Sequence, residues 1–352
     1  MTASPSAKQL SADQHCGNQQ HADQLSIDLL SPDAEPLATV VRGGVVESVH
    51  YGHLVIVAPD GDVLFSVGNP ETKIFARSSL KPLQLLASLR MGFTPHDDGE
   101  LAVAASSHNG EPMHLEKVRQ ILTNASLTES DLQNTPAYPL NAEAEFNWRV
   151  AGHGEESIAQ NCSGKHAAFL SACHSANLDP KTYLDPNHPL QQQVKTTIQE
   201  LTGDTESPNV TIDGCGAPLF STSLIGLARA FSKLATAPSG TPENQIANAM
   251  RTHPELVGGT GRDVTLAMQA VPGLIAKDGA EGVYAGALPD GTAFAFKVLD
   301  GSGRPRPAIL ARTLELAGAP LVLGVDLAKL KEIGKVPVLG HAQPVGQVEP
   351  AF

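Results

Sequence analysis

The sequence predicts an α+β fold, in which a mixed or antiparallel sheet is built from both ends of the chain and packs against a helical region. Two β-rich runs, at residues 53–67 and 282–299, each turn at an Asp-Gly pair, which is typical of β-hairpins. Most of the residues between them follow helical patterns. We therefore expect a layered structure with its functional site where the sheet and the helices meet.

The composition limits what the protein can bind. The chain has 352 residues, of which 41% are hydrophobic, and this is enough for one large core or two closely packed ones. It carries 24 basic and 37 acidic side chains, a net charge of −13, which disfavours nucleic acid and anionic membranes as partners. The sequence has no run of about 18 apolar residues, so we expect no membrane span.

The two ends of the chain differ in character from the rest. Residues 1–37 are rich in Ser, Asp, Gln and His, which predicts a disordered polar N-terminal tail. They also lack the pattern of a secretory signal. We expect one folded domain over residues 38–325 and a C-terminal tail over residues 326–352. The four cysteines form no closely spaced framework, so a disulfide scaffold is not expected. These features favour a cytoplasmic protein.

After the first hairpin, a short link leads to Arg77-Ser-Ser-Leu-Lys-Pro82, which starts a helix over residues 82–90. Ser78 and Lys81 are three positions apart and share a helix face. A neutral lysine there can take the proton of the serine hydroxyl, which makes the serine a nucleophile. Burial or a second cation must first lower the lysine pKa from about 10.4. The alternative is that Ser78 or Ser79 only caps the helix and Lys81 is solvated.

A polar segment follows the small-residue helix predicted at residues 100–105. Residues 106–112, Ser-Ser-His-Asn-Gly-Glu-Pro, place hydroxyl and amide groups directly after a buried run, and buried hydroxyls need partners. This predicts a loop of the functional site that contains Ser107. The segment also fits a helix C-terminal turn, with Gly110 as the cap and Pro112 starting the next helix.

Two further turns are rich in reactive side chains. Asn161-Cys-Ser-Gly-Lys-His166 precedes an apolar small-residue helix at residues 167–173. A strand at residues 209–212 runs into Asp213-Gly-Cys-Gly-Ala-Pro218, where glycines let the backbone approach a ligand. Both turns also have a purely structural explanation: the first as a capped helix start with its Lys and His on the surface, the second as an ordinary tight turn.

The remaining segments are predicted from their periodicity. The glycine-rich segment 253–263 lacks the spacing of a phosphate-binding loop, so nucleotide binding is not expected. Strands are expected from residue 274 to the end of the second hairpin. Helices are expected over residues 113–124, 190–201, 219–235, 243–251, 265–271 and 307–317.

Eight motifs occur in order along the chain: Arg-Ser-x-x-Lys-Pro (77–82), Ser-His-x-x-Glu (107–111), Asn-Cys-Ser-Gly-Lys-His (161–166), Asp-Pro-Asn-His-Pro (185–189), Asp-Gly-Cys (213–215), His-Pro-Glu (253–255), Gly-x-Gly-Arg (259–262) and Lys277 near a glycine. Together they resemble the Rhizobium-type (class 3) L-asparaginases over residues 42–318. The resemblance implies a fold like that of serine β-lactamases and glutaminases, usually a homodimer. It also implies hydrolysis of the L-asparagine amide to L-aspartate and ammonia.

The resemblance also implies roles for the matching residues. Ser78 matches the nucleophile and Lys81 its base, with an acyl-enzyme as the intermediate. Ser107 and Lys277 match a second serine–lysine pair. A zinc ion is implied near the substrate, where it would tune the pocket rather than activate water. The implied zinc ligands are Cys162, Lys165 and Cys215, and the implied substrate-binding residues are Arg77, His166, Asp213 and Arg262.

Three alternatives stand beside an asparaginase. A glutaminase would use the same chemistry on a substrate one methylene longer. A penicillin-recognising acyl-serine enzyme also uses S-x-x-K, but its S-D-N and K-T-G motifs are not matched, the nearest segments being residues 130–132 and 195–197. A non-catalytic zinc-binding member of the fold would keep the same turns and release no ammonia.

Overall fold

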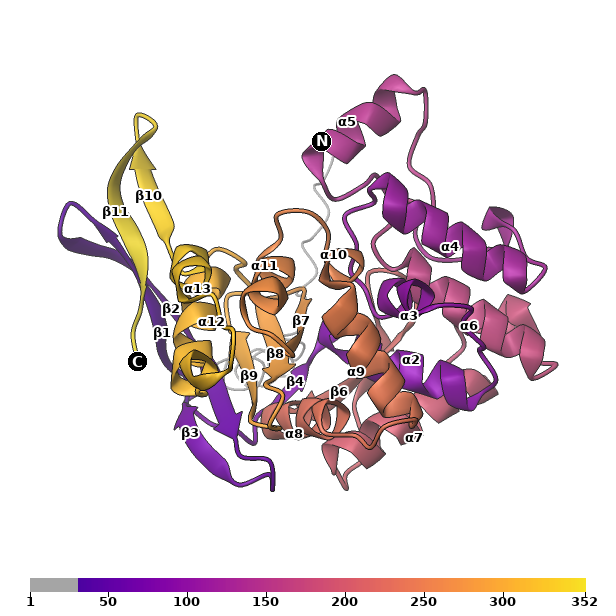
Figure 1. Cartoon of the computed structure of the whole chain (residues 1–352), viewed down its shortest axis with the longest axis horizontal. Coiled ribbons are helices and arrows are strands. Elements are labelled where there is room, and N and C mark those ends of the chain that lie inside the picture. Colours follow the sequence, from indigo (N-terminus) through magenta and orange to yellow (C-terminus); the bar gives the residue numbers. More distant parts are fainter. Residues whose placement is uncertain (1–30) are drawn as a thin grey trace, which may run out of the picture.

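The computed structural model describes residues 31–352 and has an α+β architecture (Figure 1). One large sheet made from both ends of the chain lies beside a helical region made from its middle, as predicted. Most of the predicted N-terminal tail lies outside the described residues, but the first strand already begins at Glu35, so the predicted tail is too long at its C-terminal end. Within residues 31–352, no helix combines the length and apolar character needed to cross a bilayer.

The large sheet has eight strands, and every pairing in it is antiparallel. Its strands are β1 (Glu35–Arg42), β2 (Val45–Val57), β3 (Val63–Val67), β7 (Ile275–Gly279), β8 (Val283–Ala287), β9 (Ala293–Val298), β10 (Val336–Gly340) and β11 (Gln343–Pro350). The order is β10-β11-β1-β2-β9-β8-β7, with β3 paired to β2. Both predicted hairpins are confirmed, because β2 pairs with β3 and β8 with β9.

The helical region consists of η1 (Arg77–Leu80), α2 (Lys81–Arg90), α3 (Asp98–Ala104), α4 (Pro112–Asn124), η2 (Glu129–Asp131), α5 (Ala142–Val150), α6 (Ser163–Ser175), η3 (Pro180–Thr182), α7 (Pro189–Thr202), α8 (Leu224–Ala235), α9 (Pro242–Thr252), α10 (Pro254–Val257) and α11 (Asp263–Ala270). The segments labelled η are 3-10 helices. Helix α2 lies in the middle of this region and contacts α3, α6, α7 and α9. The helix that carries Lys81 is therefore held on several sides.

A second, small sheet corrects one helix prediction. It consists of β4 (Lys73–Phe75), β6 (Pro218–Ser223) and β5 (Val210–Ile212), with β6 in the middle. The helix predicted over residues 219–235 is wrong for its first five residues, because α8 begins only at Leu224. All residues of β6 are buried between two partner strands, and its three apolar residues are followed by three polar ones, so it has no alternation that separates it from a helix.

The predicted C-terminal tail is also wrong, because these residues complete the sheet. They form helix α13 (Leu327–Ile333), which contacts α12 (Arg306–Leu316), and strands β10 and β11. Strand β11 pairs with β10 on one side and with β1 on the other. Val338 and Val348 are buried, and Val348 is opposite Val40 in the register. The strand was missed because its partner lies at the other end of the chain, beyond the reach of a local pattern.

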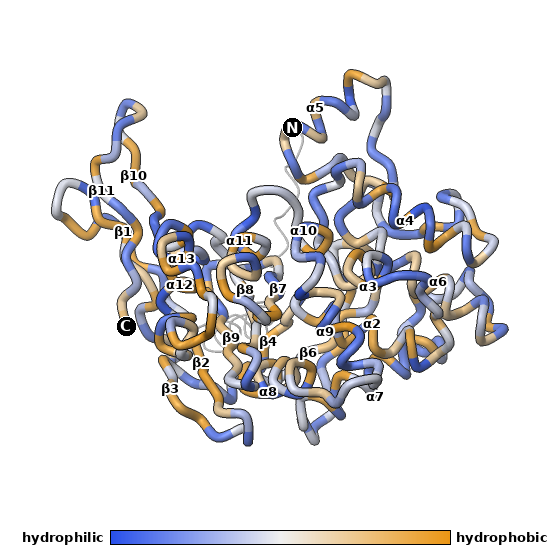
Figure 2. The backbone as a smooth tube through the Cα atoms, viewed as in Figure 1, coloured by the Kyte–Doolittle hydropathy of each residue, from blue (hydrophilic) through white to orange (hydrophobic). Residues whose placement is uncertain are grey.

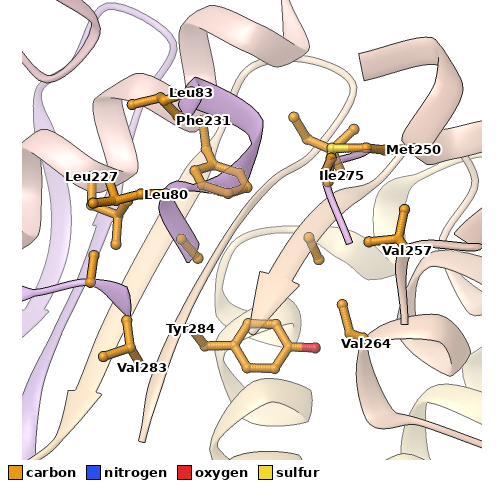
Figure 3. Packing of buried hydrophobic residues seen from close by; sticks show 14 of the residues in the cluster. Leu80, Leu83, Leu227, Phe231, Met250, Val257, Val264, Ile275, Val283 and Tyr284 are labelled. Carbon is orange, nitrogen blue, oxygen red and sulfur yellow. The ribbon is translucent and has the colours of Figure 1, made fainter. Parts of the chain in front are cut away.

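The core fills the space between the sheet and the helices. Every residue of β7 and β8 is buried, so both faces of this half of the sheet are covered. Helix α8 packs on β2, β8 and β9, and hydrophobic residues (orange in Figure 2) follow β2. Figure 3 shows Phe231 of α8, Leu83 of α2 and Tyr284 of β8 in this core. The core thus anchors the start of α2 beside β7, where the predicted site residues lie.

Candidate active site

Ser78 lies at the start of a helix, next to a residue with unusual backbone geometry. Arg77 has a φ of 52°, a left-handed value that non-glycine residues rarely adopt and that concentrates at functional sites. The turn η1 continues into α2, so Ser78 lies one turn before Lys81. Ser79 is fully buried and donates its hydroxyl to the Lys277 carbonyl oxygen at 3.1 Å, whereas Ser78 is partly exposed. Ser78 therefore carries the accessible hydroxyl of the two.

Lys81 is buried, and its amine contacts three oxygen atoms. These are the Ser106 carbonyl oxygen, Ser107 Oγ at 3.1 Å and the Asn161 carbonyl oxygen at 3.2 Å. The two carbonyls hold the amine beside Ser107 rather than Ser78, which was its predicted partner. A charged amine donates to all three oxygens. A neutral amine donates to the carbonyls and accepts the Ser107 proton, so the same position suits a base.

Lys277, on β7, is fully buried and pairs with the following residue. Its Nζ lies 2.7 Å from both Oδ1 and the main-chain oxygen of Asp278. The predicted Ser107–Lys277 pair is thus replaced by an ion pair, because a carboxylate is the stronger partner for a buried amine. Burial lowers the pKa of Lys277 to about 8; repulsion by Lys81 adds to this effect and attraction by Asp278 opposes it.

Arg262 connects this ion pair to the Ser107 loop. One of its Nη atoms binds Asp278 Oδ2, and the other donates to the Ser107 main-chain oxygen at 3.1 Å. Arg306 adds a contact to the same carboxylate oxygen at 3.4 Å. Burial raises the pKa of Asp278, but its three cationic neighbours outweigh burial and hold that pKa well below its ordinary value. Both Nη atoms of Arg262, a predicted substrate-binding residue, are therefore engaged within the protein.

The three predicted zinc ligands lie together, between the start of α6 and the turn after β5. Lys165 Nζ is 3.1 Å from Cys215 Sγ, and Cys162 is buried beside them. A hydrogen bond from Cys162 lowers the pKa of Cys215 to about 5, and the Lys165 charge adds to this, so Cys215 is a thiolate at neutral pH. The same bond raises the pKa of Cys162 to about 12. Asn161 Oδ1, 3.0 Å from Cys162 Sγ, is a second acceptor but a weaker one than a thiolate.

The other predicted substrate-binding residues adjoin this thiol cluster. Arg77 Nε is 2.7 Å from Asp213 Oδ1. Burial raises the pKa of Asp213, but Lys165 and Arg77 outweigh it, so the pKa is lowered. His166 is fully buried with Nδ1 2.7 Å from the Tyr183 hydroxyl, and burial holds its pKa well below the ordinary value. The surface positions that a simple helix start would give Lys165 and His166 are not observed.

Sequence reasoning missed two residues that contact the predicted site. Asp278 follows Lys277 inside a buried strand, and two adjacent charges in an apolar run are a signal that they are buried as a pair. Arg306 gave no comparable signal. It reaches Asp278 from α12, and that contact depends on helices and strands that only the folded chain brings together.

The chain is similar to one protein family and to several solved structures. The L-asparaginase II family model matches residues 38–350. No protein in the curated set shows significant sequence similarity to the chain. The similar structures include Mglu (14% identity, 84% of this chain, 66% of that chain, TM-score 0.40), a β-lactamase from Mycobacterium bovis (13%, 80%, 95%, 0.40) and EstCE1, a hydrolase with promiscuous acyltransferase activity (13%, 85%, 96%, 0.38).

The family match is the informative one. This chain spans just under two thirds of Mglu, and at these TM-scores the solved structures add nothing to the assignment of function. The family match, in contrast, includes both ends of the large sheet and every motif from Arg77 to Lys277. It confirms the expected resemblance to L-asparaginases and supports an amidohydrolase. The chain therefore belongs to the L-asparaginase II family.

Proposed function

We propose that this protein hydrolyses the side-chain amide of L-asparagine to L-aspartate and ammonia. The observation that carries the proposal is the buried Lys81 amine, 3.1 Å from Ser107 Oγ and one helical turn after Ser78, in a chain whose family match covers residues 38–350. A serine hydroxyl becomes a nucleophile when an adjacent neutral amine accepts its proton. The partly exposed Ser78 is the hydroxyl that a substrate can reach.

Ser78 attacks first. Its Oγ bonds to the amide carbon while its proton passes to Lys81 Nζ, which must turn from Ser107 toward Ser78 to accept it, and the carbonyl oxygen takes the negative charge. Lys81 then gives the proton to the amide nitrogen, so the C–N bond breaks and ammonia leaves. Water attacks the resulting ester and gives a proton to Lys81. The ester bond breaks, Ser78 recovers its proton from Lys81, and aspartate is released.

The second serine and lysine support this cycle. Ser107 lies against Lys81, so its hydroxyl can pass a proton to or from that amine. Burial lowers the pKa of Lys277 to about 8, and repulsion by the nearby Lys81 amine adds to this effect. An amine that gives up its proton near pH 8 therefore lies close to Lys81.

The Arg77–Asp213 pair suits the two charges of an amino-acid substrate. Asp213 Oδ1 binds Arg77 and accepts from the Gly214 amide, which leaves Oδ2 for the substrate ammonium. Arg77 uses Nε for Asp213, while its Nη1 lies 3.9 Å from Glu281 and can turn to a substrate carboxylate. Glutamine is longer by one methylene, a difference that a pocket discriminates by only about 10–200-fold.

A zinc ion suits Cys162, Lys165 and Cys215. Sulfur and nitrogen donors are those that zinc prefers, and Cys215 is already a thiolate. Lys165 must bind as the neutral amine, with the metal in place of its proton. Bound there, the ion would supply positive charge near the substrate carboxylate.

The test is ammonia release by the purified protein from L-asparagine and L-glutamine in parallel, at about pH 7 to 9. We expect release from asparagine to dominate and to fall on the order of 10⁴-fold or more in Ser78→Ala. Ser88→Ala is the matched control, because Ser88 is a buried serine on the same helix, and within residues 31–352 its hydroxyl donates to the Gln84 carbonyl oxygen alone.

Each other outcome has a distinct meaning. Ammonia release that persists in Ser78→Ala would contradict the mechanism in which Ser78 is the nucleophile. Release mainly from glutamine keeps the chemistry and changes the substrate. No release from either amide, by folded protein supplied with zinc, favours the non-catalytic zinc-binding alternative.

A further inference from the structure

We propose that Asp278 is a positioning residue, which fixes the Lys277 amine and ties it to the Ser107 loop through Arg262. The inference rests on the proposed function, because it concerns how the second lysine takes part in hydrolysis. The Lys277 amine has no other anchor in the described chain. Its hydrogen bonds within residues 31–352 go to the carboxylate and the main-chain oxygen of Asp278 alone.

The local geometry is not what a strand alone produces. Adjacent residues on a strand point to opposite faces, so Lys277 and Asp278 would normally diverge. Here the lysine stem folds back, and its Nζ lies 2.7 Å from Asp278 Oδ1. Gly279 ends the strand against η1, where a Cβ atom would come within 2.7 Å of the Ala76 carbonyl oxygen. The close packing of β7 on η1 therefore puts this ion pair directly beside the turn that carries Ser78.

The carboxylate is held from its other side. Asp278 Oδ1 serves the lysine, while Oδ2 receives Arg262 and, at 3.4 Å, Arg306. Arg306 is held in turn by Asp263, whose carboxylate lies 3.6 Å from its Nη2. Since each oxygen of Asp278 has its own cation, the carboxylate cannot rotate without breaking an ion pair. A group fixed in this way can fix the lysine.

The same contacts connect the two lysines. Arg262 donates to the Ser107 main-chain oxygen at 3.1 Å, and Ser107 Oγ lies 3.1 Å from Lys81 Nζ. A continuous path thus runs from Lys277 through Asp278, Arg262 and Ser107 to Lys81. A shift of the carboxylate is therefore expected to disturb both amines.

The charges that face Lys277 come from four directions. Asp278 is on its own strand, Lys81 comes from α2, and Arg262 lies at the start of α11. Arg306 of α12 reaches it through Asp278, together with Asp263. On β8, Tyr284 is opposite Asp278, and burial keeps the pKa of its hydroxyl high, so it adds no charge. Among residues 31–352, Asp278 is the anion in contact with Lys277, and removing it would leave the cations described above around the amine.

The decisive variant is Asp278→Asn in the full-length protein, assayed by ammonia release across pH. Without the carboxylate, the pKa of Lys277 falls further, so the acid limb of the kcat/KM profile moves down by about one pH unit or more. The freed amine is also misplaced, so kcat on the plateau falls on the order of 10²-fold. A residue that only supports the fold would lower activity without moving the limb.

Asp278→Glu is the second variant, and it keeps the carboxylate charge on a side chain that is one methylene longer. We expect its acid limb to stay near that of the wild type while kcat falls about tenfold or more. Two results would overturn the proposal: a limb that does not move in Asp278→Asn, or a wild-type kcat in Asp278→Glu. If Asp278→Asn does not fold, the kcat of Asp278→Glu decides alone.

Failure of the proposed hydrolase function can be distinguished from failure of the role proposed for Asp278. If the wild type releases no ammonia, the hydrolase assignment fails. The contact between Lys277 and Asp278 is then tested by the pH dependence of the free energy of unfolding. Lys277 loses its proton in the folded chain before the unfolded one, so the free energy of unfolding rises with pH. That rise should begin at lower pH in Asp278→Asn. An unchanged starting point would reject the proposal without any assay of turnover.

Discussion

Lys277 and Lys165 are both buried lysines beside one anion, yet the fold shifts their pKa values in opposite directions. Burial lowers the pKa of Lys277 to about 8, and its ion pair with Asp278 does not reverse this. Burial also acts to lower the pKa of Lys165, but attraction by Cys215 and by Cys162 outweighs it, so that pKa is raised. Burial alone therefore does not decide whether a lysine can become neutral.

The difference lies in what else surrounds each anion. Asp278 also pairs with Arg262 and Arg306, and its attraction for Lys277 is outweighed by burial together with repulsion from Lys81 and Arg262. Cys215 Sγ lies 3.1 Å from the Lys165 amine, and Asp213 adds further attraction. One lysine is thus prepared to give up a proton near pH 8. The other keeps its proton unless a metal ion replaces it.

Lys277→Met is the substitution with the largest expected effect on ammonia release. Methionine keeps the unbranched apolar stem and removes the amine, and Asp278 stays paired with Arg262 and Arg306, so the protein should fold. We expect ammonia release to fall on the order of 10²- to 10⁴-fold, the contribution of a proton-transfer group. Lys297→Met is the matched control: Lys297 lies on strand β9 and donates to main-chain oxygens. Equal losses in the two variants would contradict a special role for Lys277.

Cys215→Ser tests the other lysine. The change removes the thiolate and leaves Lys165 buried without its main counter-charge, so we expect the free energy of unfolding to fall by about 3 kcal/mol. We also expect zinc, measured by elemental analysis of protein purified without chelator, to fall from near-stoichiometric to trace levels. Cys173→Ser is the control, because Cys173 is buried on α6 and has no lysine partner in the part of the chain that the structure describes. Equal zinc in all three proteins would exclude Cys215 as a ligand.

The smallest expected effect is on stability against pH. The pKa of Lys277 is about 8 in the folded chain and 10.5 without the fold. Between these values the unfolded chain holds a proton that the folded chain has lost, so the free energy of unfolding rises with pH. Denaturant unfolding at several pH values in this window should show a steeper rise for the wild type than for Lys277→Met. Parallel curves would mean that Lys277 is not perturbed.

The sequence was sufficient where the signal is local. The Asp-Gly turns located both hairpins, and the spacing of Ser78 and Lys81 located the start of α2. The thiol cluster was expected from the family resemblance and is assembled in the fold. Partner choice was not local: Lys81 contacts Ser107, and Lys277 contacts Asp278. Those choices depend on which carbonyls and carboxylates the folded chain brings within reach.

The same limit explains the missed strands. Strand β6 is buried between two partners from distant segments, and β11 pairs with β1 at the opposite end of the chain. Neither strand alternates polar and apolar residues, because a strand covered on both sides or interrupted by proline and glycine need not do so. These strands form because they pair with segments that are distant in the sequence, so a local pattern cannot predict them.

The pairing of β1 with β11 has a consequence for synthesis of the protein. A ribosome makes β1 among the first described residues and β11 among the last, and Ala351 still binds the Leu37 carbonyl oxygen. During translation, one edge of β1 therefore stays unpaired until β11 has been made, and unpaired strand edges promote association between chains. The large sheet can close only after residues Gln343–Pro350 have been synthesised. A chain that stops before Gln343 keeps every predicted site residue and still leaves that edge open.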